Sequence, residues 1–153
     1  MPITILMADD DADDRRLTQE AFEEGRLIND VRFVENGEQL LEYLRKQGAY
    51  APPADAPRPG LILLDLNMPR KNGAQCLSEI RNQQELQHLP VVVLSTSSSE
   101  SIIDEMYHYG ANLYVQKPND VRSWKRVIAK VLNLDWNIQT PFSFKKNFML
   151  IDF

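Results

Sequence analysis

The sequence predicts an α/β sandwich with a mostly parallel sheet, and two observations support this class. Five short apolar runs alternate along the chain with segments that carry apolar residues at helical spacing. Such alternation favours strand–helix units around a parallel sheet. Two of the runs, Leu61–Leu64 and Val91–Leu94, are continuously apolar, which is typical of strands buried on both faces.

Length and composition indicate one globular domain. The chain has 153 residues, 43% of them hydrophobic and 25% charged, which is enough for one sizeable core. A net charge of −5 argues against nucleic-acid binding, because no basic surplus is present to neutralise phosphates. No apolar run approaches the roughly 18–20 residues that span a bilayer, and the first residues lack the basic region of a secretion signal. Cys76 is the only cysteine, so no internal disulfide forms. We expect a cytoplasmic protein that binds neither nucleic acid nor membrane.

The first half of the chain predicts two strands and two helices. These are a strand over Ile3–Ala8, an amphipathic helix over Ala12–Arg26, a strand over Val31–Val34 and a helix from Gly37 to about Gly48. In the first helix, Leu17 and Ala21 lie four residues apart with Phe22 beside them, and charges fill the other positions. The segment 51–60 has four prolines in ten residues, so we predict a long surface loop there.

The second half predicts three further strands, each followed by a helix. The elements are a strand over Leu61–Leu64, a helix over Ala74–Gln83, a strand over Val91–Leu94, a helix closed by Gly110, a strand over Leu113–Val115 and a helix over Val121–Leu132. The last helix has the clearest apolar stripe in the chain. Ser97–Ser99 is expected to cap the helix that follows it.

Polar groups follow directly on four of the five apolar runs: Asp9-Asp10-Asp11, Asp65, Ser95-Thr96 and Lys117. All carboxyl ends of a parallel sheet share one edge, so these groups can meet there. Clustered carboxylates repel one another, and a hard cation such as Mg²⁺ relieves that repulsion. A carboxylate can also attack phosphorus to give an aspartyl phosphate. A metal, a lysine and a hydroxyl donor then neutralise the phosphoryl oxygens.

Each of these signals has an ordinary structural explanation when taken alone. The acid run can cap a helix and favour its dipole, Asp65 can form a turn, and Lys117 can be a surface amine. Ser95 can bond the backbone at a strand end, and Tyr114 can pack in the core. Their joint occurrence at matching strand ends favours the functional interpretation.

Four segments resemble the signatures of a two-component response regulator receiver domain, in the order and spacing of that family. They are Ile5–Asp11, Leu63–Pro69, Ser95-Thr96 and Tyr114–Pro118, and the resemblance covers roughly residues 3–134. It implies a flavodoxin-like (βα)5 three-layer sandwich with a parallel five-stranded sheet in the order 2-1-3-4-5.

The resemblance also implies the chemistry of the site. Asp65 would be the phosphoacceptor and a ligand of Mg²⁺. Asp10 would ligate the metal, Asp9 would contribute directly or through water, and the backbone carbonyl of Asn67 would be another ligand.

Three further residues acquire roles from the resemblance. Ser95 would turn its hydroxyl toward the phosphoryl group, Lys117 would pair with that group, and Tyr114 would be the aromatic switch. A cis Lys117–Pro118 bond would aim the lysine.

As a function, the resemblance implies a single-domain response regulator that is a phosphoacceptor switch rather than an enzyme. A sensor histidine kinase or a histidine phosphotransfer protein would supply the phosphoryl group, and a downstream protein target would read the change. The expected output face comprises the fourth helix, the fifth strand and the fifth helix, with Tyr107, Tyr109, Leu113 and Trp124 on it. The proline-rich insertion and the tail resemble the single-domain receivers that partner bacterial phytochromes.

We expect residues 1–134 to form the receiver domain and residues 135–153 to form a C-terminal extension. The extension is rich in phenylalanine and other apolar residues, which is unusual for a solvated end. Two expectations follow: the extension packs on its own domain, or it forms a homodimer or partner interface.

The alternative function is a Mg²⁺-dependent phosphohydrolase that acts through an aspartyl phosphate. Such enzymes need a second acid two residues after the nucleophile, where this chain has Asn67. A nucleotide-binding module is disfavoured because no glycine-rich loop follows the first strand. A receiver fold that no longer accepts phosphate is disfavoured by the intact acid set.

Overall fold

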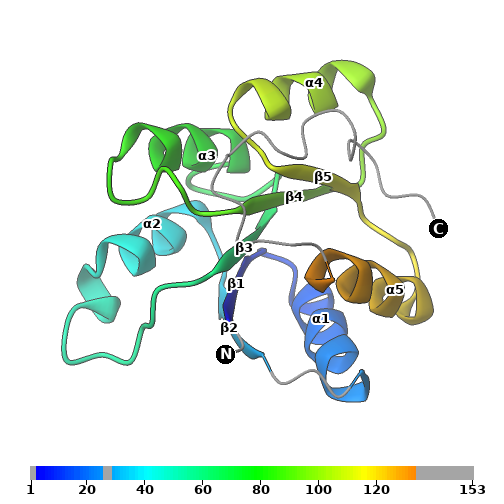
Figure 1. Cartoon of the computed structure of the whole chain (residues 1–153), viewed down its shortest axis with the longest axis horizontal. Coiled ribbons are helices and arrows are strands. Elements are labelled where there is room, and N and C mark those ends of the chain that lie inside the picture. The colour runs from blue at the N-terminus through cyan, green and yellow to red at the C-terminus, as the bar shows by residue number, and fades with distance from the viewer. Residues whose placement is uncertain (1–2, 26–28, 134–153) are drawn as a thin grey trace.

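One parallel sheet organises the chain (Figure 1). The computed structural model describes residues 3–25 and 29–133, and within them five strands pair in the order β2-β1-β3-β4-β5. The strands are β1 (Thr4–Ala8), β2 (Asp30–Val34), β3 (Leu61–Asp65), β4 (Val91–Ser95) and β5 (Leu113–Gln116). All four pairings are parallel. The predicted flavodoxin-like fold class is therefore confirmed.

Helices cover both faces of this sheet. The described ranges contain α1 (Ala12–Glu24), α2 (Gly37–Arg45), the short 3₁₀ helix η1 (Gly48–Tyr50), α3 (Gly73–Asn82), α4 (Glu100–His108) and α5 (Val121–Leu132). Helices α1 and α5 lie together on one face, and α2, α3 and α4 cover the other (Figure 1). The three predicted layers follow from this division.

Side-chain alternation along β3 explains why both faces need helices. Every residue of β3 is buried. Leu61 and Leu63 belong to the core beneath α1 and α5, whereas Ile62 and Leu64 belong to the core beneath α2, α3 and α4. Successive side chains of a strand point to opposite faces, so a continuously apolar strand requires cover on both.

The strand order creates a switch point between β1 and β3. From β1 the chain moves outward to β2, and it then returns to place β3 on the other side of β1. Crossovers therefore leave the carboxyl ends of β1 and β3 in opposite directions, which opens a crevice there. Asp9 directly follows β1, and Asp65 is the last residue of β3.

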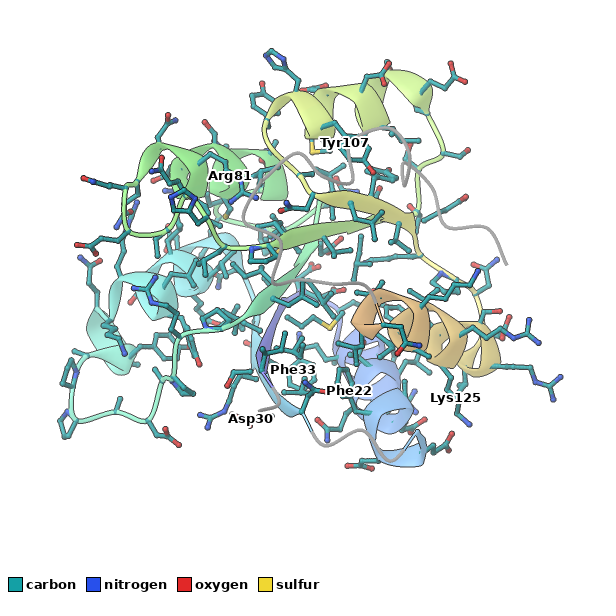
Figure 2. All side chains as sticks on the ribbon, in the orientation of Figure 1. Phe22, Asp30, Phe33, Arg81, Tyr107 and Lys125 are labelled. Carbon is teal, nitrogen blue, oxygen red and sulfur yellow. The ribbon has the colours of Figure 1, made fainter. Side chains whose placement is uncertain are left out.

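A partly buried guanidinium closes the opposite edge of the sheet. Arg81, labelled in Figure 2, donates to the carbonyl oxygens of Gly110 at 2.9 Å and Leu89 at 2.8 Å, and to Asn112 Oδ1 at 2.8 Å. Asn112 Oδ1 also accepts from the Val91 N–H at 2.8 Å. Burial lowers the pKa of Arg81 to about 10. These bonds join α3 to the start of β4 and to the turn before β5.

The proline-rich segment is the surface loop that the sequence predicts, and side chains from α2 and β2 hold it. The Tyr43 hydroxyl donates to the Pro57 carbonyl at 2.8 Å, and Arg32 pairs with Asp55 at 3.1 Å.

Three of the four residues expected on the output face are buried, so the prediction for them was wrong. Tyr107, Leu113 and Trp124 have at most 3% of their surface exposed, whereas Tyr109 is 38% exposed. The apolar stripes of α4 and α5 face the sheet. Tyr107 lies beneath α4, beside β5 (Figure 2), where its hydroxyl accepts from the Tyr114 N–H at 3.0 Å.

The predicted extension over residues 135–153 lies outside the described residues, as does the predicted end of the first helix at Arg26. Among the residues that are described, no helix combines the length and apolar character needed to cross a bilayer.

Gly73 allows the loop after β3 to close onto the strand end. Its N–H donates to the Leu66 carbonyl at 2.9 Å. A Cβ atom at this position would lie 2.7 Å from the Asp65 carbonyl oxygen and 2.9 Å from the Leu66 Cα. Both contacts are with backbone atoms, so no side-chain rotation can relieve them.

We predict that Gly73→Ala lowers the free energy of unfolding by about 1–3 kcal/mol, the usual cost of overpacking. The gain in helix propensity, at most about 1 kcal/mol, is too small to offset this cost. Urea denaturation measures the difference. Ser78→Ala, on the partly exposed face of the same helix, is the control and should change stability by less than about 0.5 kcal/mol. Equal stabilities of the two variants would contradict the prediction.

Candidate functional site

Three carboxylates converge at the carboxyl edge of the sheet. Asp9, Asp10 and Asp65 each offer an oxygen, and these oxygens lie within 4.8 Å of one another. Asp9 is fully buried and Asp65 is 4% exposed, whereas Asp10 is exposed. The pairing of β1 with β3 brings the two buried acids together from positions 56 residues apart in the sequence.

The acid run after β1 divides its members between two tasks. Asp11 is the N-cap of α1, and its side chain accepts a hydrogen bond from the Asp13 N–H at 2.8 Å. Asp9 instead turns into the site, where its Oδ1 accepts from the Asp11 N–H at 2.9 Å. The ordinary explanation of the run therefore holds for Asp11, while Asp9 and Asp10 join the cluster.

Lys117 supplies the positive charge at this edge. Its Nζ lies 2.7 Å from Asp14 Oδ2, 3.1 Å from Asp65 Oδ1 and 3.2 Å from Asp9 Oδ2. The lysine side chain is only 11% exposed. One ammonium therefore lies within ion-pair distance of all three carboxylates.

The backbone brings Lys117 to the site without the expected cis bond. Within the described residues the cis peptide is Pro52–Pro53, and the prediction of a cis Lys117–Pro118 bond was wrong. The Lys117 N–H donates to the Ser95 carbonyl at 2.7 Å. This bond extends the β4–β5 ladder, and the three carboxylates then direct the side chain.

Burial shifts the pKa values of these groups. Burial and the charge of Asp65 together raise the pKa of Asp9 to about 7, against the opposing effects of the Asp11 N–H hydrogen bond and the charge of Lys117. Burial also raises the pKa of Asp65, although Lys117 opposes the change. For Lys117, burial lowers the pKa, but the hydrogen bond to Asp14 and the charges of Asp9 and Asp65 raise it overall. The lysine therefore stays charged.

The cluster fits a divalent cation. Asp9 Oδ2 is buried without a hydrogen-bond partner. Its 3.2 Å contact with Lys117 is an ion pair that lacks hydrogen-bond geometry. An unsatisfied buried carboxylate oxygen is costly, and a hard cation held by two or three carboxylates would satisfy it. Asn67 lies next to this set and is exposed, and its N–H donates to Asp65 Oδ1 at 3.4 Å.

A chain of hydrogen bonds leads from Ser95 to α4. The buried Ser95 hydroxyl accepts from the Ser97 N–H at 3.1 Å. The Tyr114 hydroxyl donates to the Ser97 carbonyl at 2.7 Å, and the Tyr114 ring is fully buried. Ser99, within the predicted capping segment, is the N-cap residue of α4, although its side chain makes no capping hydrogen bond. Its hydroxyl bonds Ser101 instead, at 3.0 Å.

Asp14 is the site residue that the sequence analysis missed. It lies in the first turn of α1, four residues before the buried Thr18 and seven before the buried Ala21. Its position in the sequence could have identified it, because an acid in line with the buried residues of a helix needs a partner. Lys117 is that partner, from 103 residues away in the sequence.

The site therefore places the carboxylate of Asp65 between the ammonium of Lys117 and the carboxylates of Asp9 and Asp10, which could bind a cation. Such a carboxylate can act as a nucleophile toward phosphorus. The surrounding positive charge would offset the charge on phosphoryl oxygens.

Comparison with known proteins identifies the family. The chain matches the family model of the response regulator receiver domain over residues 5–129. It is 34% identical to response regulator Rcp1 of Synechocystis over 130 residues, which covers 85% of this chain and 86% of Rcp1. The match does not support the phosphohydrolase alternative.

Solved structures agree with this assignment. The Mn²⁺-bound form of Rcp1 superposes with a TM-score of 0.78 at 32% identity, covering 91% of this chain and 98% of that one. The phosphorylated cyanobacterial phytochrome response regulator RcpA superposes with a TM-score of 0.77 at 36% identity, covering 86% of this chain and 91% of RcpA. RPA3017, a response regulator in red light signalling of R. palustris, gives 0.80 at 37% identity with the same coverage. The chain therefore belongs to the response regulator receiver domain family of two-component systems.

Proposed function

We propose that this protein is a stand-alone phosphorylation switch in which Asp65 accepts a phosphoryl group from a phosphohistidine. The donor would be a sensor histidine kinase or a histidine phosphotransfer protein. The observation that carries the proposal is the 3.1 Å contact of Asp65 Oδ1 with Lys117 Nζ, beside a cluster of three carboxylates. The chain aligns with 86% of Rcp1 and 91% of RcpA, so the similarity to these response regulators extends over most of their length and supports the proposal.

Mg²⁺ is the proposed cofactor. Asp9, Asp10 and Asp65 would hold it together with the backbone carbonyl of Asn67. When bound, it would neutralise charge on the carboxylates and on the phosphoryl oxygens. The unsatisfied Asp9 oxygen supports this assignment, as does the Mn²⁺-bound form of Rcp1.

In the proposed transfer, an Asp65 oxygen attacks phosphorus in line. A new O–P bond forms while the P–N bond to the donor histidine breaks, and the imidazole leaves with the electron pair of that bond. Lys117 would then bond a phosphoryl oxygen in place of the Asp65 carboxylate. Ser95 would exchange its bond with the Ser97 N–H for one to a second phosphoryl oxygen.

The new group would carry a charge of about −1.5 to −2, by analogy with phosphoserine. Movement of Ser95 would break its bond to Ser97, whose carbonyl also holds the Tyr114 hydroxyl. Tyr114 would act as the aromatic switch and pass the change to α4 through Tyr107. This is a population shift between two packings. Exposed residues around Tyr109 would present the result to a downstream protein.

Two of the similar response regulators suggest which class of histidine kinase donates the phosphoryl group. RcpA is a phytochrome response regulator, and RPA3017 acts in red light signalling. Similarity to both supports a photoreceptor histidine kinase of the phytochrome class as the partner, with the cytoplasm as the compartment. A homodimer remains a proposal for the extension over residues 135–153.

We predict that acetyl phosphate with Mg²⁺ adds one phosphoryl group to the protein, and that Asp65→Asn abolishes the addition because the amide is not a nucleophile. Intact mass spectrometry measures the product. Asp104→Asn, an exposed change of the same kind on α4, is the control and should be phosphorylated like the wild type. Phosphorylation of the Asp65→Asn protein would contradict the proposal. Rapid catalytic release of phosphate from small esters would instead support a phosphohydrolase.

We also predict that Mg²⁺ binding weakens by up to about tenfold per pH unit below about pH 7, because a proton and the cation compete for Asp9. The pKa of Asp9 is raised from 3.8 to about 7, so between these values the folded protein retains a proton that the unfolded chain has lost. The stability of the metal-free protein therefore falls as pH rises from about 4 to about 7. The stabilisation by Mg²⁺ should be largest above about pH 7, where Asp9 has lost its proton.

Thermal unfolding with and without Mg²⁺, at about pH 6 and about pH 8, measures this effect. The gain in Tm should be larger at the higher pH. Calorimetry at the lower pH should detect close to one proton released per cation. Asp9→Asn is the control, because its amide has no proton to release. A gain in Tm that does not vary with pH would contradict the prediction.

A further inference from the structure

The closest carboxylate to Lys117 lies outside the proposed metal set. Asp14 Oδ2 is 2.7 Å from Lys117 Nζ, whereas the proposed acceptor Asp65 is 3.1 Å away and Asp9 is 3.2 Å away. A contact of 2.7 Å between an ammonium and a carboxylate is at the short end of charge-assisted hydrogen bonds. The strongest partner of the lysine is therefore an acid with no other role in the proposed transfer.

The helix geometry of α1 aims Asp14 at the site and its neighbour away from it. The Asp14 side chain is 18% exposed, and the Asp13 side chain is 81% exposed. Successive residues of a helix point about 100° apart, so only one of the two adjacent acids can face the sheet edge. Asp13 instead pairs with Arg16 on the solvent side, at 3.6 Å.

Charge balance shows why a separate partner for the lysine is useful. Without metal, Lys117 lies against two of the proposed ligands, Asp9 and Asp65. A divalent cation bound by these carboxylates would repel the ammonium at short range. Asp14 is not in the ligand cluster, so its charge stays available to the lysine.

We propose that Asp14 is a positioning residue: it is the standing counter-ion of Lys117 and keeps the ammonium beside Asp65 when a cation occupies the carboxylate cluster. One N–H of the ammonium stays with Asp14, and the other two remain free to bond phosphoryl oxygens. This inference rests on the proposed function, because it assigns the residue that prepares the lysine for that transfer.

The inference requires two effects of Asp14→Asn on Mg²⁺ binding, and they act in the same direction. Loss of the charge makes the site less negative, and a lysine without Asp14 competes more strongly with the cation for Asp9 and Asp65. We expect the Kd for Mg²⁺ to rise by about fivefold to tenfold in calorimetric titration. Phosphorylation by acetyl phosphate at saturating Mg²⁺ should slow by about tenfold, the effect of one charge-assisted hydrogen bond.

Asp13→Asn is the matched control. It removes the same formal charge one residue away on the same helix, from a side chain that faces solvent. Both the Kd and the rate should stay within about twofold of the wild type, because exposed charges are screened. If Mg²⁺ affinity and phosphorylation rate fell equally in both variants, the effect would come from net charge alone and the inference would be overturned.

The ammonium resonance of Lys117 in a heteronuclear NMR spectrum gives a readout that does not depend on phosphorylation. Its absence from the Lys117→Met spectrum assigns it. We expect the resonance to persist in wild type with and without Mg²⁺, to persist in Asp13→Asn, and to broaden or vanish in Asp14→Asn at saturating Mg²⁺. An unchanged resonance in Asp14→Asn at saturating Mg²⁺ would overturn the inference.

Asp14→Glu keeps the test valid if the asparagine variant does not fold. The longer side chain retains the charge and moves the carboxylate by one methylene. The Lys117 resonance should then shift but remain visible, and an unshifted resonance would contradict the contact. If wild type itself accepts no phosphoryl group, the proposed function fails while the NMR comparison still tests Asp14. If wild type is phosphorylated and Asp14→Asn behaves like Asp13→Asn, only the inference about Asp14 fails.

Discussion

Repulsion among the carboxylates at one edge of the sheet is the constraint on which the rest of the site depends. Asp9 and Asp65 are buried side by side, and one lysine offsets their charge. The balance is incomplete, since an Asp9 oxygen has no hydrogen bond and burial raises the pKa of that carboxyl to about 7. A protein selected only for stability would avoid such a group. The incomplete balance is consistent with the proposed site, which a cation and a phosphoryl group would complete.

The amino edge of the sheet, unlike the carboxyl edge, holds a charged group whose hydrogen bonds are well satisfied. At the amino edge the partly buried Arg81 donates hydrogen bonds to carbonyl and amide oxygens, and these bonds join α3 to the segments before β4 and β5. Between the edges, strands covered on both faces form a close-packed core that resists small displacements. The unsatisfied charges therefore sit on a rigid support. The proposed switch would begin in the loop after β4, where Ser97 bonds both Ser95 and Tyr114.

Much of the fold could be predicted because its determinants are local. Short, mostly apolar runs located the five strands to within one residue at each end, and apolar stripes located the helices. The same stripes also show where prediction failed. Tyr107 and Trp124 were expected on the surface, yet each belongs to the stripe that its helix buries. Periodicity gives the buried face of a helix, and this information should have outweighed the aromatic character of the two residues.

For the site, the sequence alone determined which chemical groups stand at the strand ends: Asp9, Asp65, Ser95 and Lys117. The pairings of β1 with β3, β3 with β4 and β4 with β5 were needed to decide which of these groups touch. Tertiary structure alone showed that Asp14 is the nearest partner of Lys117 and that this lysine needs no cis bond to reach it. The physical reason is the range of the interactions. Hydrophobic period and turn chemistry act over a few neighbouring residues, whereas an ion pair across 103 residues exists only after the sheet has set the distance between its partners.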